Sequence, residues 1–180
     1  MDLAKAERDK QISLSDKDLM DLVAGKAKVV MYQQLPEFSD IEDFLAPHGA
    51  VFLLYQSAAA FGHWVAVFKR GDTIEFFDPY GLFPDSELKW TTPELRPKFN
   101  MDHTYLLRLL YLAPQRYQIV YNEHRFQKMD KKTNTCGRWS ALRLQFRHLS
   151  LEDFVKKFDL KKTKSGLNDD IVTLMTEEPR

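Results

Sequence analysis

The sequence predicts a single α+β domain that extends over residues 1–180. Three observations support this fold class: the length and the 44% hydrophobic content suffice for one buried core, strand-like and helix-like apolar patterns alternate along the chain, and no repeat interrupts them. No apolar run approaches the roughly 20 residues that a membrane span needs. We therefore expect one globular domain that does not enter a membrane, with polar and loosely held ends at residues 1–14 and 161–180.

The first expected elements are a short helix and a buried strand. Ser15 is suited to cap the helix because Asp18 follows three residues later, apolar residues then recur at helical spacing, and Gly25 ends the pattern. Ala50–Gln56 is a continuous apolar run of strand length that follows Gly49, so it predicts a strand inside the core.

The remaining elements follow from turn and cap residues. Residues 63–81, "HWVAVFKRGDTIEFFDPYG", contain two β-rich runs around Gly71 and predict a hairpin. Residues 104–113 predict a helix that ends before a proline, and residues 116–122 predict another strand. Residues 150–158 predict a last short helix with a serine cap.

The hairpin places a histidine and a carboxylate together. A two-residue turn at residues 70–71 pairs His63 directly with Asp78, whereas a turn at 71–72 shifts the pairing by two residues and leaves both on the same face. Glu75 falls on the opposite face in either register. A histidine beside a carboxylate is suited to act as a general base, and such a pair is also a common structural contact.

Cys136 is the only cysteine of the chain. It follows turn and N-cap residues at 133–135 and precedes apolar positions at helical spacing, so it is expected at a helix N-terminus. The helix dipole and unpaired N–H groups at such a position favour the thiolate, and Gly137 would leave room for a substrate carbonyl. The alternative interpretation of a lone cysteine is a small buried apolar residue.

Four short motifs in one order resemble those of a known superfamily. "GHW", "FFDPYG", Gln127 and, nine residues later, "CG" resemble the adenovirus-type (adenain-like) and ubiquitin-like-protein-specific cysteine proteases. The resemblance implies a papain-like core, in which a mixed β-sheet is flanked by helices and the nucleophile begins a helix. It also implies that His63 is the general base, Asp78 its orienting partner, Gln127 an oxyanion donor and Cys136 the nucleophile.

The resemblance also suggests substrate-binding residues. Trp64 would roof a narrow tunnel that favours glycine near the cleaved bond, with Gly137 beside the nucleophile; the alternative for Trp64 is a sheet residue packed with its neighbours. The spacing from Gln127 to Cys136 is longer than in the family, because a basic loop is inserted there. Gln118, within a predicted strand, is the alternative oxyanion donor.

These features predict a cysteine endopeptidase that cleaves viral capsid or structural precursors near glycine-containing sites during virion maturation. The alternatives are a ubiquitin- or SUMO-like-protein isopeptidase and a non-catalytic binding module on a protease fold. We expect a protein substrate and no metal or other cofactor. Without a second cysteine, any peptide activator would have to bind non-covalently. The charged first residues lack the apolar centre of a secretory signal, so we expect an intracellular protein of the host cytoplasm or nucleus, and of the virion if it is viral.

The charge is unevenly distributed along a chain of zero net charge. Residues 96–164 hold sixteen Lys or Arg against six Asp or Glu, and the rest of the chain is acidic. Three lysines of this stretch lie just before the nucleophile and are named the loop lysines here: Lys128, Lys131 and Lys132. They predict non-specific DNA binding; the alternative is that the charges pair with the acidic segments or only solvate the surface.

Overall fold

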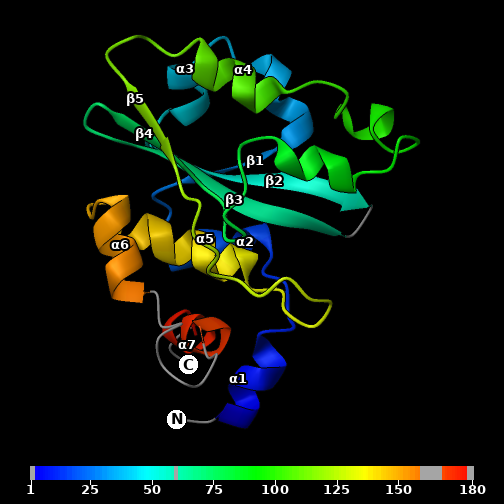
Figure 1. The fold of residues 1–180 in the computed structure, drawn as a ribbon, viewed down its shortest axis with the longest axis vertical. Coiled ribbons are helices and arrows are strands. Elements are labelled where there is room, and N and C mark those ends of the chain that lie inside the picture. The colour runs from blue at the N-terminus through cyan, green and yellow to red at the C-terminus, as the bar shows by residue number, and fades with distance from the viewer. Residues whose placement is uncertain (1–2, 59–60, 159–167, 178–180) are drawn as a thin grey trace.

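The computed structural model describes residues 3–58, 61–158 and 168–177, and its centre is a mixed five-stranded sheet (Figure 1). The strands lie in the order β1-β2-β3-β4-β5, with β1–β2 and β4–β5 parallel and the two central pairs antiparallel. The α+β prediction is therefore confirmed. The strand bounds are Lys28–Met31, Ala50–Ala58, Phe61–Arg70, Thr73–Phe77 and Gln118–Tyr121.

Helices cover both faces of this sheet (Figure 1). The two crossovers that join the parallel strands place α3 (Ile41–Leu45) and α4 (Tyr105–Tyr111) on one face. The helices α2, α5 and α6 cover the other face, and their bounds are Asp16–Leu22, Cys136–Gln145 and Leu151–Phe158. Three 3₁₀ helices complete the crossovers: η1 (Tyr32–Glu37), η2 (Ser86–Trp90) and η3 (Pro97–Phe99).

Each face of the sheet has its own apolar core. In β3, Trp64, Ala66 and Phe68 point to the core under α5, and Val65 and Val67 point to the core under α3 and α4. This alternation follows from the two-residue period of a strand. It explains why the continuous apolar runs in the sequence are strands buried on both sides.

The predicted capping box is confirmed. Ser15 caps α2, its hydroxyl accepts from the backbone N–H of Asp18, and the Asp18 carboxylate accepts from the backbone N–H of Ser15. Beyond it, α5 is buried along nearly its whole length, since the residues from Cys136 to Leu144 all lie in the interior. The helix that begins at the cysteine is thus a central element of the core and fixes that residue firmly.

The β3–β4 hairpin adopts the second of the two registers considered. Arg70 pairs with Thr73, so the turn lies at residues 71–72, and Gly71 has the positive φ of +57° that such a turn favours. His63 and Asp78 nevertheless share a face, as expected from both registers, because the shift is an even number of residues.

Glu75 points to the opposite face, as predicted, where it meets a buried arginine. Its two carboxylate oxygens accept from Nε and Nη2 of Arg143 in α5, at 2.7 and 2.8 Å, and the two side chains are 1% and 0% exposed. The bidentate pair joins the sheet to the helix that carries Cys136.

Both ends of the chain contain helices, although the sequence suggested loosely held ends. α1 (Leu3–Asp9) and α7 (Asn168–Met175) pack together, and they bury Ala6 and Val172 completely. Of the predicted loose ends, residues 1–2, 161–167 and 178–180 lie outside the described residues. None of the helices in the described ranges is long and apolar enough to cross a membrane.

Candidate active site

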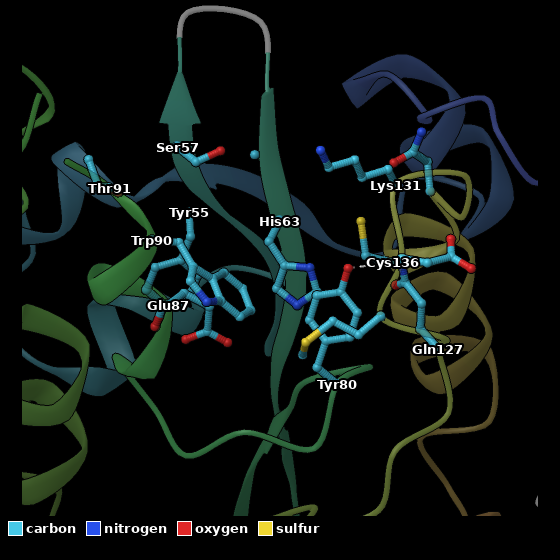
Figure 2. A pocket seen from close by; sticks show the side chains of 14 residues that line it. Tyr55, Ser57, His63, Tyr80, Glu87, Trp90, Thr91, Gln127, Lys131 and Cys136 are labelled. Carbon is cyan, nitrogen blue, oxygen red and sulfur yellow. Dashed lines mark hydrogen bonds between the residues drawn. The ribbon is translucent and has the colours of Figure 1, made fainter.

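The structure brings Cys136, His63 and Asp78 together, with the cysteine at the first position of α5 as predicted. Figure 2 shows His63 and Cys136 in the same cavity. Cys136 is 6% exposed and lines a cavity beside His63. The imidazole and the backbone N–H groups of Trp64 and Gly137 lie near enough to the sulfur to lower the pKa of Cys136. Both interpretations of the cysteine therefore hold in part, because the residue is buried and its sulfur faces a cavity.

His63 and Asp78 form a short buried pair. The Nε2 atom of His63 lies 2.6 Å from Oδ1 of Asp78, so Nδ1 is the ring nitrogen left for the thiol. The carboxylate is held in place by backbone donors, because Oδ1 accepts from Tyr80 N–H and Oδ2 from Leu82 N–H. The side chain of Asn122 binds both the backbone N–H and the carbonyl of Asp78. These contacts orient the acid before any substrate arrives.

The electrostatics of this cluster favour a thiolate–imidazolium pair. Burial disfavours the imidazolium, but the charge and hydrogen bond of Asp78, together with Cys136, outweigh it and raise the pKa of His63 to about 10. Burial also disfavours the thiolate, yet the His63 contact and two backbone N–H groups lower the pKa of Cys136 below its ordinary value. The proton that the two groups share is therefore held by His63.

Gln127 lies in the same cavity with a fixed side-chain amide. Its Nε2 donates to the carbonyl oxygen of Thr133 at 2.9 Å and to the hydroxyl of Tyr80 at 3.3 Å, and its Oε1 is buried without a partner. The bond to Thr133 orients one N–H and leaves the other directed at the Tyr80 side of the cavity. Gln118, the alternative donor, begins the edge strand β5 and does not line this cavity.

Aromatic side chains form the wall next to His63 (Figure 2). The Tyr80 ring stacks on the imidazole, with centroids 4.4 Å apart and an 11° angle between the planes, and the Trp90 ring meets His63 edge-on at 5.9 Å. Stacking on an aromatic face favours the charged imidazolium. Together with Tyr55, these rings line a cavity of about 710 Å³, whose opposite wall is the loop before Cys136.

Two predicted substrate-binding residues lie elsewhere. Trp64 does not line this cavity; its side chain is 5% exposed and packs in the core under α5, as the alternative interpretation proposed. Gly137 is also buried, and a Cβ atom there would lie 3.1 Å from Leu19 and 3.3 Å from the Trp64 ring. The glycine thus permits close packing of α5 against α2 and β3, and it is not among the residues that line the cavity.

The basic stretch is only partly on the surface. The three loop lysines are exposed, and Lys131 lines the cavity (Figure 2). Lys128 pairs with Asp130 at 2.9 Å, and Arg138 and Arg143 are buried. The positive surface near the nucleophile is therefore smaller than the sequence suggested, since the helix arginines serve packing and ion pairing inside the protein.

The loop before Cys136 is held by an aspartate that the sequence analysis did not identify. One oxygen of Asp169 in α7 accepts from the Thr135 hydroxyl and from Trp139 Nε1, and the other accepts from the backbone N–H of Lys128 at 2.9 Å. Thr135 occupies the N-cap position of α5 without capping it through its side chain. No local pattern marks Asp169, because the three residues that its carboxylate binds lie 30 or more residues away in the sequence.

Three titratable side chains in the site lie close enough together to be compared with a set of metal ligands. His63, Asp78 and Glu87 each offer one ligand atom, and these atoms lie within 4.8 Å of one another. However, Nε2 of His63 is 2.6 Å from Oδ1 of Asp78, whereas two ligands of a tetrahedral zinc ion are about 3.3 Å apart. The short contact fits a hydrogen bond, so the cluster is organised for proton sharing.

The fold and the site define an α+β protein with a cysteine, a histidine and an aspartate clustered at a helix N-terminus. A protein of Sputnik virophage that carries the name uncharacterized protein V9 is 38% identical to this chain over 168 residues, which are 92% of this chain and 95% of the relative. The chain belongs to the family of this virophage protein. No family model matches it.

Two solved structures are similar to this one, each at 15% identity and over 91% of this chain. The pS273R protease of ASFV gives a TM-score of 0.48 over 69% of its own chain. The central domain of the uncharacterized Lpg1148 protein from Legionella pneumophila gives 0.38 over 94% of its chain. At these levels of similarity, the roles of individual residues are assigned from the contacts within the cavity of this protein.

Proposed function

We propose that the protein is a cysteine endopeptidase with Cys136 as nucleophile and His63 as general base and acid. The observation that carries the proposal is the buried His63–Asp78 pair beside Cys136, because His63 and Cys136 both line a cavity large enough for a peptide segment. The pKa of the thiol is lowered and the pKa of the neighbouring imidazole is raised to about 10. This is the electrostatic arrangement that peptide hydrolysis by a cysteine nucleophile requires.

The reaction follows from these positions. The Cys136 thiolate attacks the scissile carbonyl carbon, a carbon–sulfur bond forms, and the carbonyl electron pair moves to oxygen. The N–H groups at the start of α5 are the available donors for that oxyanion, and Gln127 adds one if the N–H that donates to the Tyr80 hydroxyl turns to the oxyanion. The carbonyl then re-forms as the carbon–nitrogen bond breaks and His63 protonates the leaving amine. His63 next takes a proton from water, the hydroxide attacks the thioester carbon, and cleavage of the carbon–sulfur bond releases the carboxyl product and restores the thiolate–imidazolium pair.

A substrate class can be proposed from the shape of the cavity and from the virophage relative. We expect cleavage of viral structural precursors, in the infected cell or the particle, at glycine-containing sites. Trp90 and Tyr80, which line the cavity beside His63, replace Trp64 as the aromatic residues that would exclude larger side chains. The alternatives remain a ubiquitin- or SUMO-like isopeptidase and a non-catalytic binding module.

The loop lysines support a second proposal, which is sequence-independent binding of DNA. All three are exposed, and Lys131 lines the cavity in which a substrate would bind. Contacts between lysines and phosphates would hold the enzyme near substrates in a particle that contains nucleic acid, and they would weaken steeply with salt.

One assay separates the three functions. The full chain and Cys136→Ala are incubated with a fluorogenic peptide that contains Gly-Gly, with its Ala-Ala counterpart, and with ubiquitin and SUMO that carry a C-terminal fluorophore. Cleavage of the Gly-Gly peptide alone, abolished in Cys136→Ala, supports the endopeptidase. Preference for a ubiquitin-like substrate supports the isopeptidase. Unchanged cleavage in a folded Cys136→Ala protein, or no cleavage by the wild type, would overturn the proposed activity.

A further inference from the structure

Glu87 is a buried acid whose role the reaction above leaves open. It lies in η2, is 2% exposed, and lines the cavity. Figure 2 shows it on the side of His63 opposite to Cys136. Neither of its carboxyl oxygens has an assigned hydrogen-bond partner, although both are shielded from solvent. A buried polar group of this kind costs stability unless a nearby group interacts with it.

The groups around Glu87 are mostly acidic or neutral. Asp78 and His63 offer polar atoms within 4.8 Å, and Tyr55, which faces it from β2, already uses its hydroxyl to donate to Asp85. Lys131, from the loop before Cys136, lies on the Cys136 side of His63, away from Glu87 (Figure 2). Among the residues that the structure describes, His63 is therefore the cation beside the two carboxyl groups, and it is already paired with Asp78 at 2.6 Å.

These surroundings disfavour a second carboxylate. Burial and the negative charge of Asp78 raise the pKa of Glu87 to about 9, although the positive charge of His63 acts in the opposite direction. Glu87 is then a neutral acid at pH 7, and its O–H requires an acceptor. Asp78 can supply one, because its Oδ2 accepts from Leu82 N–H alone and a carboxylate oxygen has two lone pairs.

We propose that Glu87 is a positioning residue, which donates its carboxyl proton to Asp78 and thereby holds that carboxylate against His63. The two acids then present one negative charge to the imidazole. A neutral donor on Asp78 also keeps Asp78 ionised, which preserves the acceptor that His63 Nε2–H needs. The kinetic consequence rests on the proposed protease function, whereas the state of the proton does not.

The first test measures the proton itself in the full-length wild-type protein. Glutamate labelled with ¹³C at the side-chain carboxyl is incorporated, and the Glu87 signal is identified by its disappearance in Glu87→Gln. We expect this carbon to titrate near pH 9, well above the ordinary glutamate value of about 4.3. Titration below pH 7, which would leave Glu87 ionised at neutral pH, would overturn the proposal. This measurement needs no turnover, so it remains decisive if the protein proves not to be a protease.

The second test compares Glu87→Gln with Glu87→Leu. The glutamine amide is neutral and keeps an N–H donor, so we expect kcat at pH 7 within about threefold of wild type and the pH profile of Cys136 alkylation by iodoacetamide unchanged. Leucine removes the donor, so we expect kcat at least tenfold lower at unchanged KM and alkylation shifted to higher pH. Equal losses of kcat in both variants, or an effect on KM alone, would contradict donation to Asp78.

Folding is monitored in both variants by thermal unfolding. If Glu87→Leu does not fold, Glu87→Gln and the ¹³C titration still decide the question. A protein that cleaves no peptide but shows the high glutamate pKa would refute the proposed function and support the assignment of the proton.

Discussion

Asp78→Asn should abolish most of the activity for a reason that can be followed atom by atom. Oδ1 of Asp78 accepts from His63 Nε2 and Tyr80 N–H, and Oδ2 accepts from Leu82 N–H. Asparagine has one oxygen, so its NH₂ group must face one of these donors. If it faces His63, Nε2 becomes an acceptor and Nδ1 carries the proton, which prevents Nδ1 from taking the proton of the thiol.

The expected magnitude is large. The charge and hydrogen bond of Asp78 are the main causes that raise the pKa of His63 to about 10, and each pKa unit corresponds to about 1.4 kcal/mol. Loss of the orienting acid in a triad lowers kcat by about 10⁴-fold, so we expect a decrease of roughly 10³- to 10⁴-fold here. Initial rates with the peptide measure it. The pH dependence of iodoacetamide alkylation should shift from a lowered thiol pKa in the wild type toward the free value of about 8.5 in Asp78→Asn.

Glu75→Gln is the matched control, since Glu75 lies on the same strand but faces the opposite core. Gln cannot balance the fully buried charge of Arg143, so we expect the free energy of unfolding to fall by about 3–5 kcal/mol. The kcat of the folded fraction should stay within about twofold. A similar loss of kcat in both variants, or an unchanged thiol pKa in Asp78→Asn, would refute the roles assigned to the two acids.

Three further predictions follow from the same contacts. Gln127→Ala should lower kcat by about 10²-fold or more, the effect of one lost oxyanion donor, while Gln118→Ala changes it little; the reverse result would exchange the two residues. Changing all three loop lysines to Ala should weaken DNA binding and flatten its salt dependence, and no binding by the wild type at low salt would remove DNA from the proposal. Asp169→Asn should lower kcat several-fold without affecting KM, whereas Asp170→Asn, which loses only its contact with Lys10, should not.

The parts of the site that the sequence predicted are those controlled by local geometry. The period of a strand places His63 and Asp78 on one face in either register, and the turn residues before Cys136 are followed by a helix that begins at the cysteine. The capping box at Ser15 is a similar case, because its donors and acceptors lie within three residues of each other. Such features depend on backbone geometry and need no information about distant segments.

The parts that the sequence did not predict depend on tertiary contacts. Trp64 was expected over the substrate, but the strand alternation that directs His63 to one core directs Trp64 to the other. No local sequence pattern marks Glu87, because its proposed role depends on the position of η2 beside Asp78. From the sequence alone, Arg143 resembles a charged residue on the surface of a helix. It is buried because it pairs with Glu75, which lies 68 residues away in the sequence.

The two ends of the chain support the nucleophile although neither lines the cavity. The loop before Cys136 is held from one side by α7, through Asp169, and from the other by the segment after α1, where Asn134 donates to the carbonyl oxygens of Lys10 and Gln11 at 2.7 Å each. The two supports are themselves joined, because Lys10 pairs with Asp170 at 3.1 Å. A cysteine that begins a helix can attack only in the direction that the preceding loop permits. The position of the sulfur relative to His63 therefore depends on residues from both termini as much as on the helix that carries it.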